Sequence, residues 1–293
     1  MTVCIQPNDT IALACPASQC DNENQVLQTK AYLRKNYHLN ACYHKETYQA
    51  CSKKIRADIF CDYLFNPDIK LIWALRGGEG SADLIPLIHQ QQHKIQQLNP
   101  KLLMGFSDIT ALLLYFSQQY NWPVIHGFNA RQLALKTIAP KSEKLTFDLL
   151  FNLDKNYSLE LESFNAVAEK IQSFEHLLIG GNLSLINISI HDIWEIQANN
   201  KILFLEDVHE KPHAVLRTLK YFTRIGLFKF VKGIILGQFM NPRLEKSVDL
   251  TMQFALKEWA KAMNRPVWHT LQISHGRNNI PIPFNRPMHL KII

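Results

Sequence analysis

The chain of 293 residues is long for a single hydrophobic core, and its length favours two domains of roughly 100–200 residues each. Hydrophobic residues make up 47% and charged residues 19%, a balance typical of globular proteins that excludes disordered, collagen-like and coiled-coil chains. The net charge of +7 comes from basic residues that stand singly or in pairs. Such a diffuse excess favours solubility over nucleic-acid binding, so we expect no nucleic-acid partner.

All six cysteines lie within the first 61 residues, and none forms a Cys-x-x-Cys pair. This spacing indicates neither a zinc ribbon nor a redox motif, and we expect reduced thiols packed as small apolar groups. No stretch approaches the ~18 apolar residues of a membrane helix. The N-terminal region also lacks the basic start of a signal peptide. We therefore expect a cytoplasmic protein without a membrane partner.

The first half of the chain alternates short apolar runs with helical patterns. An uninterrupted apolar run such as Lys70–Leu75 suits a parallel strand that is buried on both faces. Alternating strands and helices predict an α/β unit with a parallel sheet. The predicted strands are 11–15, 70–75, 101–104 and 123–126, and the predicted helices are 26–36, 54–64 and 110–119, with a further helical pattern that begins at Ala82.

The second half begins with a less periodic, more polar stretch. Residues 131–172 predict a connecting segment between an N-terminal domain, 1–130, and a C-terminal domain, 173–293. A helix at 212–225 is expected to begin near Pro212, because proline lacks only an N–H that the first turn leaves unpaired. The other predicted elements are strands at 177–179, 202–205 and 233–236, a helix at 248–263, and a proline-rich loop at 279–284.

The segment Gly105-Phe106-Ser107-Asp108 follows an apolar strand and precedes a helix. A serine on such a sharp turn exposes its hydroxyl near backbone N–H groups that can stabilise an oxyanion. The alternative is that Ser107 or Asp108 merely caps the helix. The local sequence leaves both interpretations open.

The segment Arg76-Gly77-Gly78-Glu79-Gly80 also joins a strand to a helix. Bare glycine amides at such a place form a cradle for anions, and the alternative interpretation is a tight turn without a binding role. The glycine spacing lacks the full G-x-G-x-x-G fingerprint, and no acidic residue lies between Asp83 and Asp108. We therefore expect no dinucleotide cofactor.

Two further segments carry groups suited to acid–base chemistry. The strand that contains Phe204 leads into Glu206 and Asp207, where a carboxylate could orient a histidine or simply face solvent. His275 lies in the glycine-flanked segment Ser274-His275-Gly276, where it is either a base or an ordinary surface residue.

The segment His209-Glu210-Lys211-Pro212-His213 formally matches the zinc motif H-E-x-x-H. That motif requires one continuous helix, and a proline inside a helix costs ~3 kcal/mol. Pro212 instead predicts the start of a helix, with His209 outside it. We expect no metal site.

Taken together, these segments resemble the LD-carboxypeptidase family, which includes murein tetrapeptide carboxypeptidases and microcin C immunity peptidases. The resemblance spans almost the whole chain in order and spacing. It rests on IALACPAS, LIWALRGGEG, KLLMGFSDITALLLYF, LLIGGNLSLI, ILFLEDVHEKPHAVLRTL, GIILGQF and SHGRNNIPIPF.

The resemblance implies an α/β fold with a Rossmann-like parallel-sheet N-terminal domain and a smaller mixed α/β C-terminal domain. It implies a nucleophile at Ser107, a triad carboxylate at Glu206 and a general base at His275. The backbone amides of Gly78 and Asp108 would form the oxyanion hole. Gly77, Glu79 and Asn182 would lie at the substrate, a small peptide such as murein tetrapeptide. A homodimer without cofactor or metal is also implied.

The chain departs from the family pattern at Glu79, where an aromatic residue is usual, and also at Cys15 and His209, where small residues are usual. The departure at Glu79 keeps a second substrate open, a peptide–nucleotide or acyl-adenylate antibiotic. A third interpretation is a catalytically silent binding protein on the same scaffold. The presence of Ser107, Glu206 and His275 argues against it.

Overall fold

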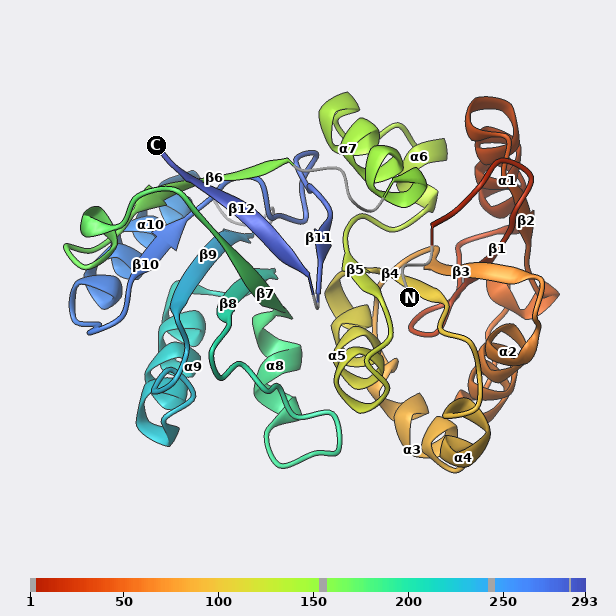
Figure 1. The fold of residues 1–293 in the computed structure, drawn as a ribbon, viewed down its shortest axis with the longest axis horizontal. Helices are drawn as coiled ribbons and strands as arrows, with labels where there is room; N and C mark the ends of the chain where they lie inside the picture. Colours follow the sequence, from red (N-terminus) through yellow and green to blue (C-terminus); the bar gives the residue numbers. More distant parts are fainter. Residues whose placement is uncertain (1–3, 153–156, 242–245, 285) are drawn as a thin grey trace. The chain divides into compact units, whose positions relative to one another are not determined.

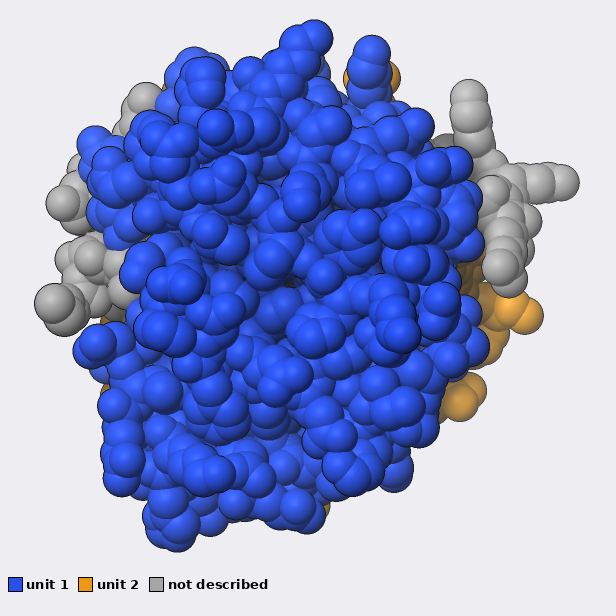
Figure 2. Space-filling model, turned by 90° about the vertical axis from the view of Figure 1, so that its right-hand side faces the viewer, with its two compact units in different colours: residues 1–155, 280–283 blue, residues 156–279, 284–293 orange. Residues whose placement is uncertain are grey.

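The computed structural model describes residues 4–152, 157–241, 246–284 and 286–293. The chain divides into two compact units, which Figure 2 shows in two colours. The first comprises 1–155 with 280–283, and the second comprises 156–279 with 284–293. Among the described residues, no helix combines the length and apolar character that a membrane crossing needs.

The first unit is built on a six-stranded sheet with the order β11-β5-β4-β3-β1-β2. Its first five strands in the chain are parallel, and β11 pairs antiparallel with β5. Because the strands are covered on both faces, their side chains are almost entirely buried. The strands are β1 (Thr10–Ala14), β2 (Asn40–Cys42), β3 (Ile69–Ala74), β4 (Leu102–Gly105), β5 (Val124–His126) and β11 (Ile282–Pro283).

Helices cover both faces of this sheet. In Figure 1, α1, α6 and α7 lie on one side and α2 to α5 on the other. The helices are α1 (Glu23–Tyr37), α2 (Lys53–Phe65), α3 (Ile85–His89), α4 (Gln92–Ile95), α5 (Thr110–Gln119), α6 (Arg131–Ala134) and α7 (Pro140–Phe151), with short 3₁₀ turns η1 (Lys45–Tyr48), η2 (Ala82–Leu84) and η3 (Ser107–Ile109). The predicted α/β unit with a parallel sheet is confirmed.

The second unit is a closed barrel with the order β10-β6-β12-β7-β8-β9. Strands β7 to β10 run parallel, whereas β12 is antiparallel to β7 and β6 is antiparallel to β10, so the unit is a mixed α/β structure as expected. Its elements are β6 (Ser158–Ser163), β7 (Phe174–Asn182), β8 (Ile202–Val208), β9 (Gly233–Met240), β10 (Val267–His269), β12 (Pro287–Ile292), α8 (Leu183–Ser189), α9 (Pro212–Ile225), α10 (Lys246–Lys261) and the 3₁₀ turn η4 (Ala168–Lys170).

The predicted connecting segment, 131–172, differs from the structure. Its first part forms α6 and α7 in the first unit, where the ring of Phe147 packs 5.8 Å from that of Trp73. Its second part contains β6, in which Leu159 and Leu161 are buried in the barrel of the second unit. Several of its polar residues, among them Ser142, Thr146 and Asn165, are buried beside the apolar ones, and this mixture obscures its period.

The predicted loop at 279–284 also differs from the structure, because it contains β11. Ile282 pairs with His126 and Pro283 with Ile125, so the end of the chain supplies the edge strand of the first sheet. Proline is tolerated there because an edge strand leaves one row of N–H groups without a partner strand. The predicted C-terminal domain, 173–293, therefore loses 280–283 to the first unit.

Candidate active site

Ser107 lies on a strained turn between β4 and the helical segment that follows. Its φ of 64° is left-handed, a conformation that costs an ordinary L-residue about 1–2 kcal/mol. A Cβ on Gly105 would lie 2.8 Å from Cγ2 of Ile109, so only glycine fits at that position of the turn. A sharp turn of this kind between a strand and a helix projects the serine hydroxyl away from the backbone.

The alternative interpretation, a helix cap, is not what the structure shows. The residues at the cap positions of η3 and α5 are Phe106 and Ile109, and neither cap has a side-chain hydrogen bond. The carboxylate of Asp108 instead accepts a hydrogen bond from the amide of Ser81, at 2.8 Å. Ser107 therefore occupies its turn without serving as the cap.

The glycine loop 76–80 lies directly against Ser107. A Cβ on Gly77 would be 3.0 Å from Cβ and 3.1 Å from Oγ of Ser107, so a side chain there would crowd the hydroxyl. Gly78 has a φ of 125°, and a Cβ at this position would lie 2.1 Å from Oγ of Ser18. A side chain at Gly77 would thus have to displace the Ser107 side chain, whereas Gly78 is favoured both by space and by its backbone conformation.

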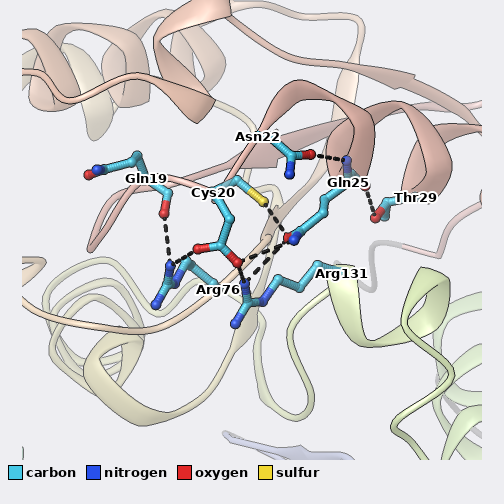
Figure 3. Close-up of polar contacts among 8 residues, drawn as sticks. Gln19, Cys20, Asn22, Gln25, Thr29, Arg76 and Arg131 are labelled. Carbon is cyan, nitrogen blue, oxygen red and sulfur yellow. Dashed lines mark hydrogen bonds and ion pairs between the residues drawn. The ribbon is translucent and has the colours of Figure 1, made fainter.

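An ion-pair network holds the start of this loop. Asp21 accepts hydrogen bonds from Nη1 of Arg76 at 2.8 Å and from Nη1 of Arg131 at 3.0 Å (Figure 3). Arg76 also donates to the carbonyl oxygen of Gln19, at 3.2 Å. These contacts join the segment after β1, the loop after β3 and the start of α6 at the carboxyl end of the sheet. In open parallel sheets, ligands bind at this end.

The far part of the loop is held by Arg56 and Ser18. Nη1 of Arg56 donates to the carbonyl oxygens of Pro16 and Ala17 and, at 3.4 Å, of Glu79. The amide of Glu79 donates to Oγ of Ser18, at 3.2 Å. Because only the backbone of Glu79 is engaged in these contacts, its exposed carboxylate can vary without moving the loop.

In the second unit, the predicted carboxylate and base lie together. Nδ1 of His275 is 2.6 Å from Oε2 of Glu206, whose side chain is fully buried, and the His275 side chain is 12% exposed. Burial by itself lowers the pKa of His275. The charge and hydrogen bond of Glu206, together with the charge of Asp207, outweigh burial and raise that pKa above its ordinary value. The alternatives, a solvated strand end and a surface histidine, are excluded by this burial.

A local irregularity of the barrel makes room for the histidine segment. The register between β8 and β9 shifts beside Glu206. Gly237 lies opposite, and a Cβ there would be 2.7 Å from the carbonyl oxygen of Ile273 and 3.1 Å from Cβ of Glu206. That same carbonyl accepts a hydrogen bond from the amide of Gln238, at 2.8 Å. The shift therefore anchors the segment that carries His275 against Glu206.

A turn centred on Ser274 fixes the other side of His275. Oγ of Ser274 donates to the carbonyl oxygen of Asn278 at 2.7 Å and accepts from the amide of Gly276 at 3.0 Å. Ser274 is buried, so these bonds are shielded from water. The histidine thus stands between two anchored residues rather than on a loose loop.

Asp207 and Asn182 form a buried network beside Glu206. Nδ2 of Asn182 donates to Asp207 at 2.7 Å, and its Oδ1 caps α8 by accepting from the amide of Leu185 at 3.1 Å. Asp207 also accepts from the amide and the hydroxyl of Ser184. Burial, and then the charge of Glu206, raise the pKa of Asp207. Asn182, predicted at the substrate, is engaged through both of its polar groups in supporting the strand end.

The zinc-like motif is divided as its proline predicts. Helix α9 begins at Pro212, and His209 precedes it with a left-handed φ of 69°. Within the described ranges, no cluster of three or more histidine, cysteine or acidic side chains has the arrangement of a metal site.

The predicted residues therefore form two groups. The first unit brings together Ser107, Asp108, Gly77, Gly78 and the backbone of Glu79, and the second brings together Glu206, His275 and Asn182. Sequence reasoning missed the supporting residues Ser81, Arg56 and Ser274. Ser81 directly follows the glycine loop, which was its one available signal, whereas nothing local marks Arg56.

Comparison with protein families gives two matches that together cover most of the chain. Residues 11–127 match the LD-carboxypeptidase N-terminal domain, and residues 176–290 match the LD-carboxypeptidase C-terminal domain. The glycine loop and Ser107 fall within the first match, and Glu206 and His275 within the second.

Two carboxypeptidases are similar to this chain along most of their own length. A putative carboxypeptidase of Rickettsia conorii is 32% identical over 95% of this chain and 86% of its own. The murein tetrapeptide carboxypeptidase of Pseudomonas aeruginosa is 30% identical over 96% of this chain and 93% of its own.

Solved structures show the same fold at lower identity. The microcin C7 self-immunity protein MccF superposes with a TM-score of 0.81 at 21% identity, covering 99% of this chain and 95% of its own. A muramoyltetrapeptide carboxypeptidase from Oxalobacter formigenes gives a TM-score of 0.77 at 22% identity, covering 95% of this chain and 94% of its own.

Proposed function

This chain belongs to the LD-carboxypeptidase family, and from that premise we propose that it is a serine carboxypeptidase that releases the C-terminal D-amino acid of murein tetrapeptide. The bond broken is the amide between an L-centre and the terminal D-residue, a step of peptidoglycan recycling. The proposal is supported by the 30% identity to a murein tetrapeptide carboxypeptidase over nearly the whole chain.

The observation that carries the catalytic assignment is the buried pair of Glu206 and His275. A carboxylate 2.6 Å from Nδ1 holds the imidazole in the tautomer whose Nε2 can act as a base. The same carboxylate stabilises the imidazolium that forms when the base accepts a proton. This arrangement is the one that a serine nucleophile needs for activation.

In the proposed mechanism, Oγ of Ser107 attacks the carbonyl carbon of the scissile amide while its proton passes to Nε2 of His275. The amides of Gly78 and Asp108 stabilise the negative charge that develops on the carbonyl oxygen. Removal of one such donor typically lowers kcat by about 10²–10³-fold. As the tetrahedral intermediate collapses, the C–N bond breaks and His275 protonates the departing amine. Water then hydrolyses the acyl-enzyme by the same steps and restores Ser107.

The test is release of D-alanine from a murein tetrapeptide by purified protein. Ser107→Ala is expected to lower kcat by at least about 10⁴-fold, because loss of the nucleophile disables the whole triad. A matched control is Ser117→Ala, which removes another serine hydroxyl, buried in α5 and bonded to the carbonyl of Leu114. Wild-type turnover by Ser107→Ala would disprove the nucleophile assignment.

Two further assays separate the other interpretations. If the protein cleaves a peptide–nucleotide conjugate but not the tetrapeptide, the substrate assignment changes to the conjugate, and the serine mechanism stays as proposed. If the folded protein cleaves neither compound and Ser107 remains unlabelled by a fluorophosphonate, the protein is a binding protein instead. A homodimer, which the family resemblance implies, and action in the cytoplasm, which is expected separately from the sequence, belong to the same proposal. Light scattering on the purified chain tests the dimer, and cell fractionation tests the compartment.

A further inference from the structure

Two loops of the first unit are joined by a reciprocal pair of hydrogen bonds. The amide of Ser81 donates to Oδ2 of Asp108 at 2.8 Å, and Oγ of Ser81 donates to the backbone carbonyl oxygen of Asp108 at 2.5 Å. The carboxylate also accepts from the amide of Gly80. Ser81 is fully buried and Asp108 is 6% exposed, so water does not compete for these bonds.

The two loops are those that carry the proposed oxyanion donors. Gly78 lies three residues before Ser81, at the far end of a glycine-rich stretch that has little stiffness of its own. Asp108 carries the second donor on its own backbone. Ser81 follows the glycine loop that carries the Gly78 amide, and Asp108 bears the other proposed donor. The bonds between Ser81 and Asp108 thus connect the two loops directly.

Positioning is the effect that best explains a carboxylate here. Burial raises the pKa of Asp108, and the hydrogen bonds from Ser81 and Gly80, together with the charge of Arg56, act against that shift by stabilising the ionised form. A negative charge near a developing oxyanion is unfavourable in itself. The benefit of Asp108 to catalysis must therefore come from where it holds the backbone, since small errors in donor placement lower rates strongly.

We propose that the Asp108 carboxylate and the Ser81 hydroxyl form a clamp that sets the spacing between the amides of Gly78 and Asp108. Through its side chain, Asp108 is then a positioning residue, in addition to the role of its amide. This inference rests on the proposed function, because it concerns the donors of that reaction.

The test is a series of variants assayed for kcat and KM on the tetrapeptide. Asp108→Ala removes the acceptor and is expected to lower kcat about 10²-fold, as for a donor displaced by about 1 Å. Asp108→Asn keeps a neutral oxygen acceptor and should recover most of that loss. Ser81→Ala removes only the hydroxyl and should lower kcat about tenfold, by analogy with partial loss of one donor. KM is expected to stay within about twofold throughout.

A second readout separates positioning from general loss of structure. Inhibition by a boronic acid analogue, whose adduct with Ser107 places an oxygen in the oxyanion hole, should weaken in parallel with kcat. Ser117→Ala should change neither kcat nor inhibition, even if it lowers the melting temperature. The double variant Ser81→Ala/Asp108→Ala should have a lower kcat than Asp108→Ala, because Asp108→Ala leaves the bond from the Ser81 hydroxyl to the Asp108 carbonyl oxygen in place and Ser81→Ala removes it.

Three outcomes would overturn the clamp. The first is a kcat of Asp108→Ala equal to that of the wild type, and the second is a kcat of Asp108→Asn above that of the wild type. The third is a variant of the clamp whose kcat falls while its inhibition by the boronic acid stays as strong as that of the wild type. If the wild-type protein releases no D-alanine, the proposed substrate fails separately. Hydrogen exchange of residues 77–80 then tests the clamp without turnover, because Asp108→Ala should increase it and Ser117→Ala should not.

Discussion

His275 is influenced by two carboxylates that act differently. Glu206 contacts its ring at 2.6 Å, whereas Asp207 acts on it through charge alone while bonding to Asn182 and Ser184. The net result is a pKa raised above the ordinary histidine value of about 6.5. A general base must be neutral, so kcat/KM should rise with pH through this raised pKa.

Replacement of Glu206 by glutamine tests this electrostatic arrangement. Without the carboxylate, burial lowers the pKa of His275, so the acid limb of the kcat/KM profile should move to lower pH. The plateau of kcat should fall by about 10³–10⁴-fold, because the imidazolium loses its stabilising partner. The measurement is a pH–rate profile of each protein. Glu210→Gln, which neutralises a carboxylate four residues further along the chain, should leave the limb in place. An acid limb at or above the wild-type position in Glu206→Gln would contradict the pairing.

At the scale of elements, two helices offer a matched comparison of their caps. Asn182 caps α8 and Asn22 caps α1, each by accepting a hydrogen bond from the amide three residues later. Asn182 additionally donates to the buried Asp207, whereas Asn22 is exposed. The two caps therefore differ in how much of the surrounding structure depends on them.

Asn22→Ala should lower stability by about 1 kcal/mol, the usual value of a cap. Asn182→Ala should lower it by about 2–4 kcal/mol, because a buried carboxylate also loses a donor. Hydrogen exchange in α1 for the first variant, and in β7 and β8 for the second, measures these free energies. Equal losses would show that the bond to Asp207 contributes nothing beyond the cap.

An element could be predicted from the sequence when the residues that determine it lie within or next to it. Helices 110–119 and 212–225 were predicted with the bounds observed for α5 and α9, since apolar spacing and Pro212 are local signals. The turn at Ser107 was likewise readable from strand, glycine and helix in series. The burial of Glu206 was not, because it depends on the shifted register opposite Gly237 and on the distant Ile273. Strand β11 was missed because it has only two residues, which form a strand only through their pairing with β5, a strand far away in the sequence.

At the scale of the whole molecule, the last segment of the chain serves both units. Ile282 belongs to the first unit, where it is fully buried on β11, and Leu290 belongs to the second, where it is fully buried on β12. The two residues are close in sequence and comparable in size. They can therefore report on the two units separately.

Ile282→Ala should lower the stability of the first unit, and Leu290→Ala that of the second, each by about 2–5 kcal/mol. Hydrogen exchange should increase at β5 in the first variant and at β6 and β7 in the second, since these strands are the direct partners. Equal effects on both sets of strands in either variant would contradict the division into units.

The return of residues 280–283 to the first sheet also bears on biosynthesis. A ribosome makes the chain from its N-terminus, so β5 emerges long before the strand that completes its edge. Until then the nascent protein presents an unpaired β-edge, the kind of surface on which chains associate wrongly. The first unit thus reaches its final form only after most of the second unit has been made, although most of the first unit is made before it.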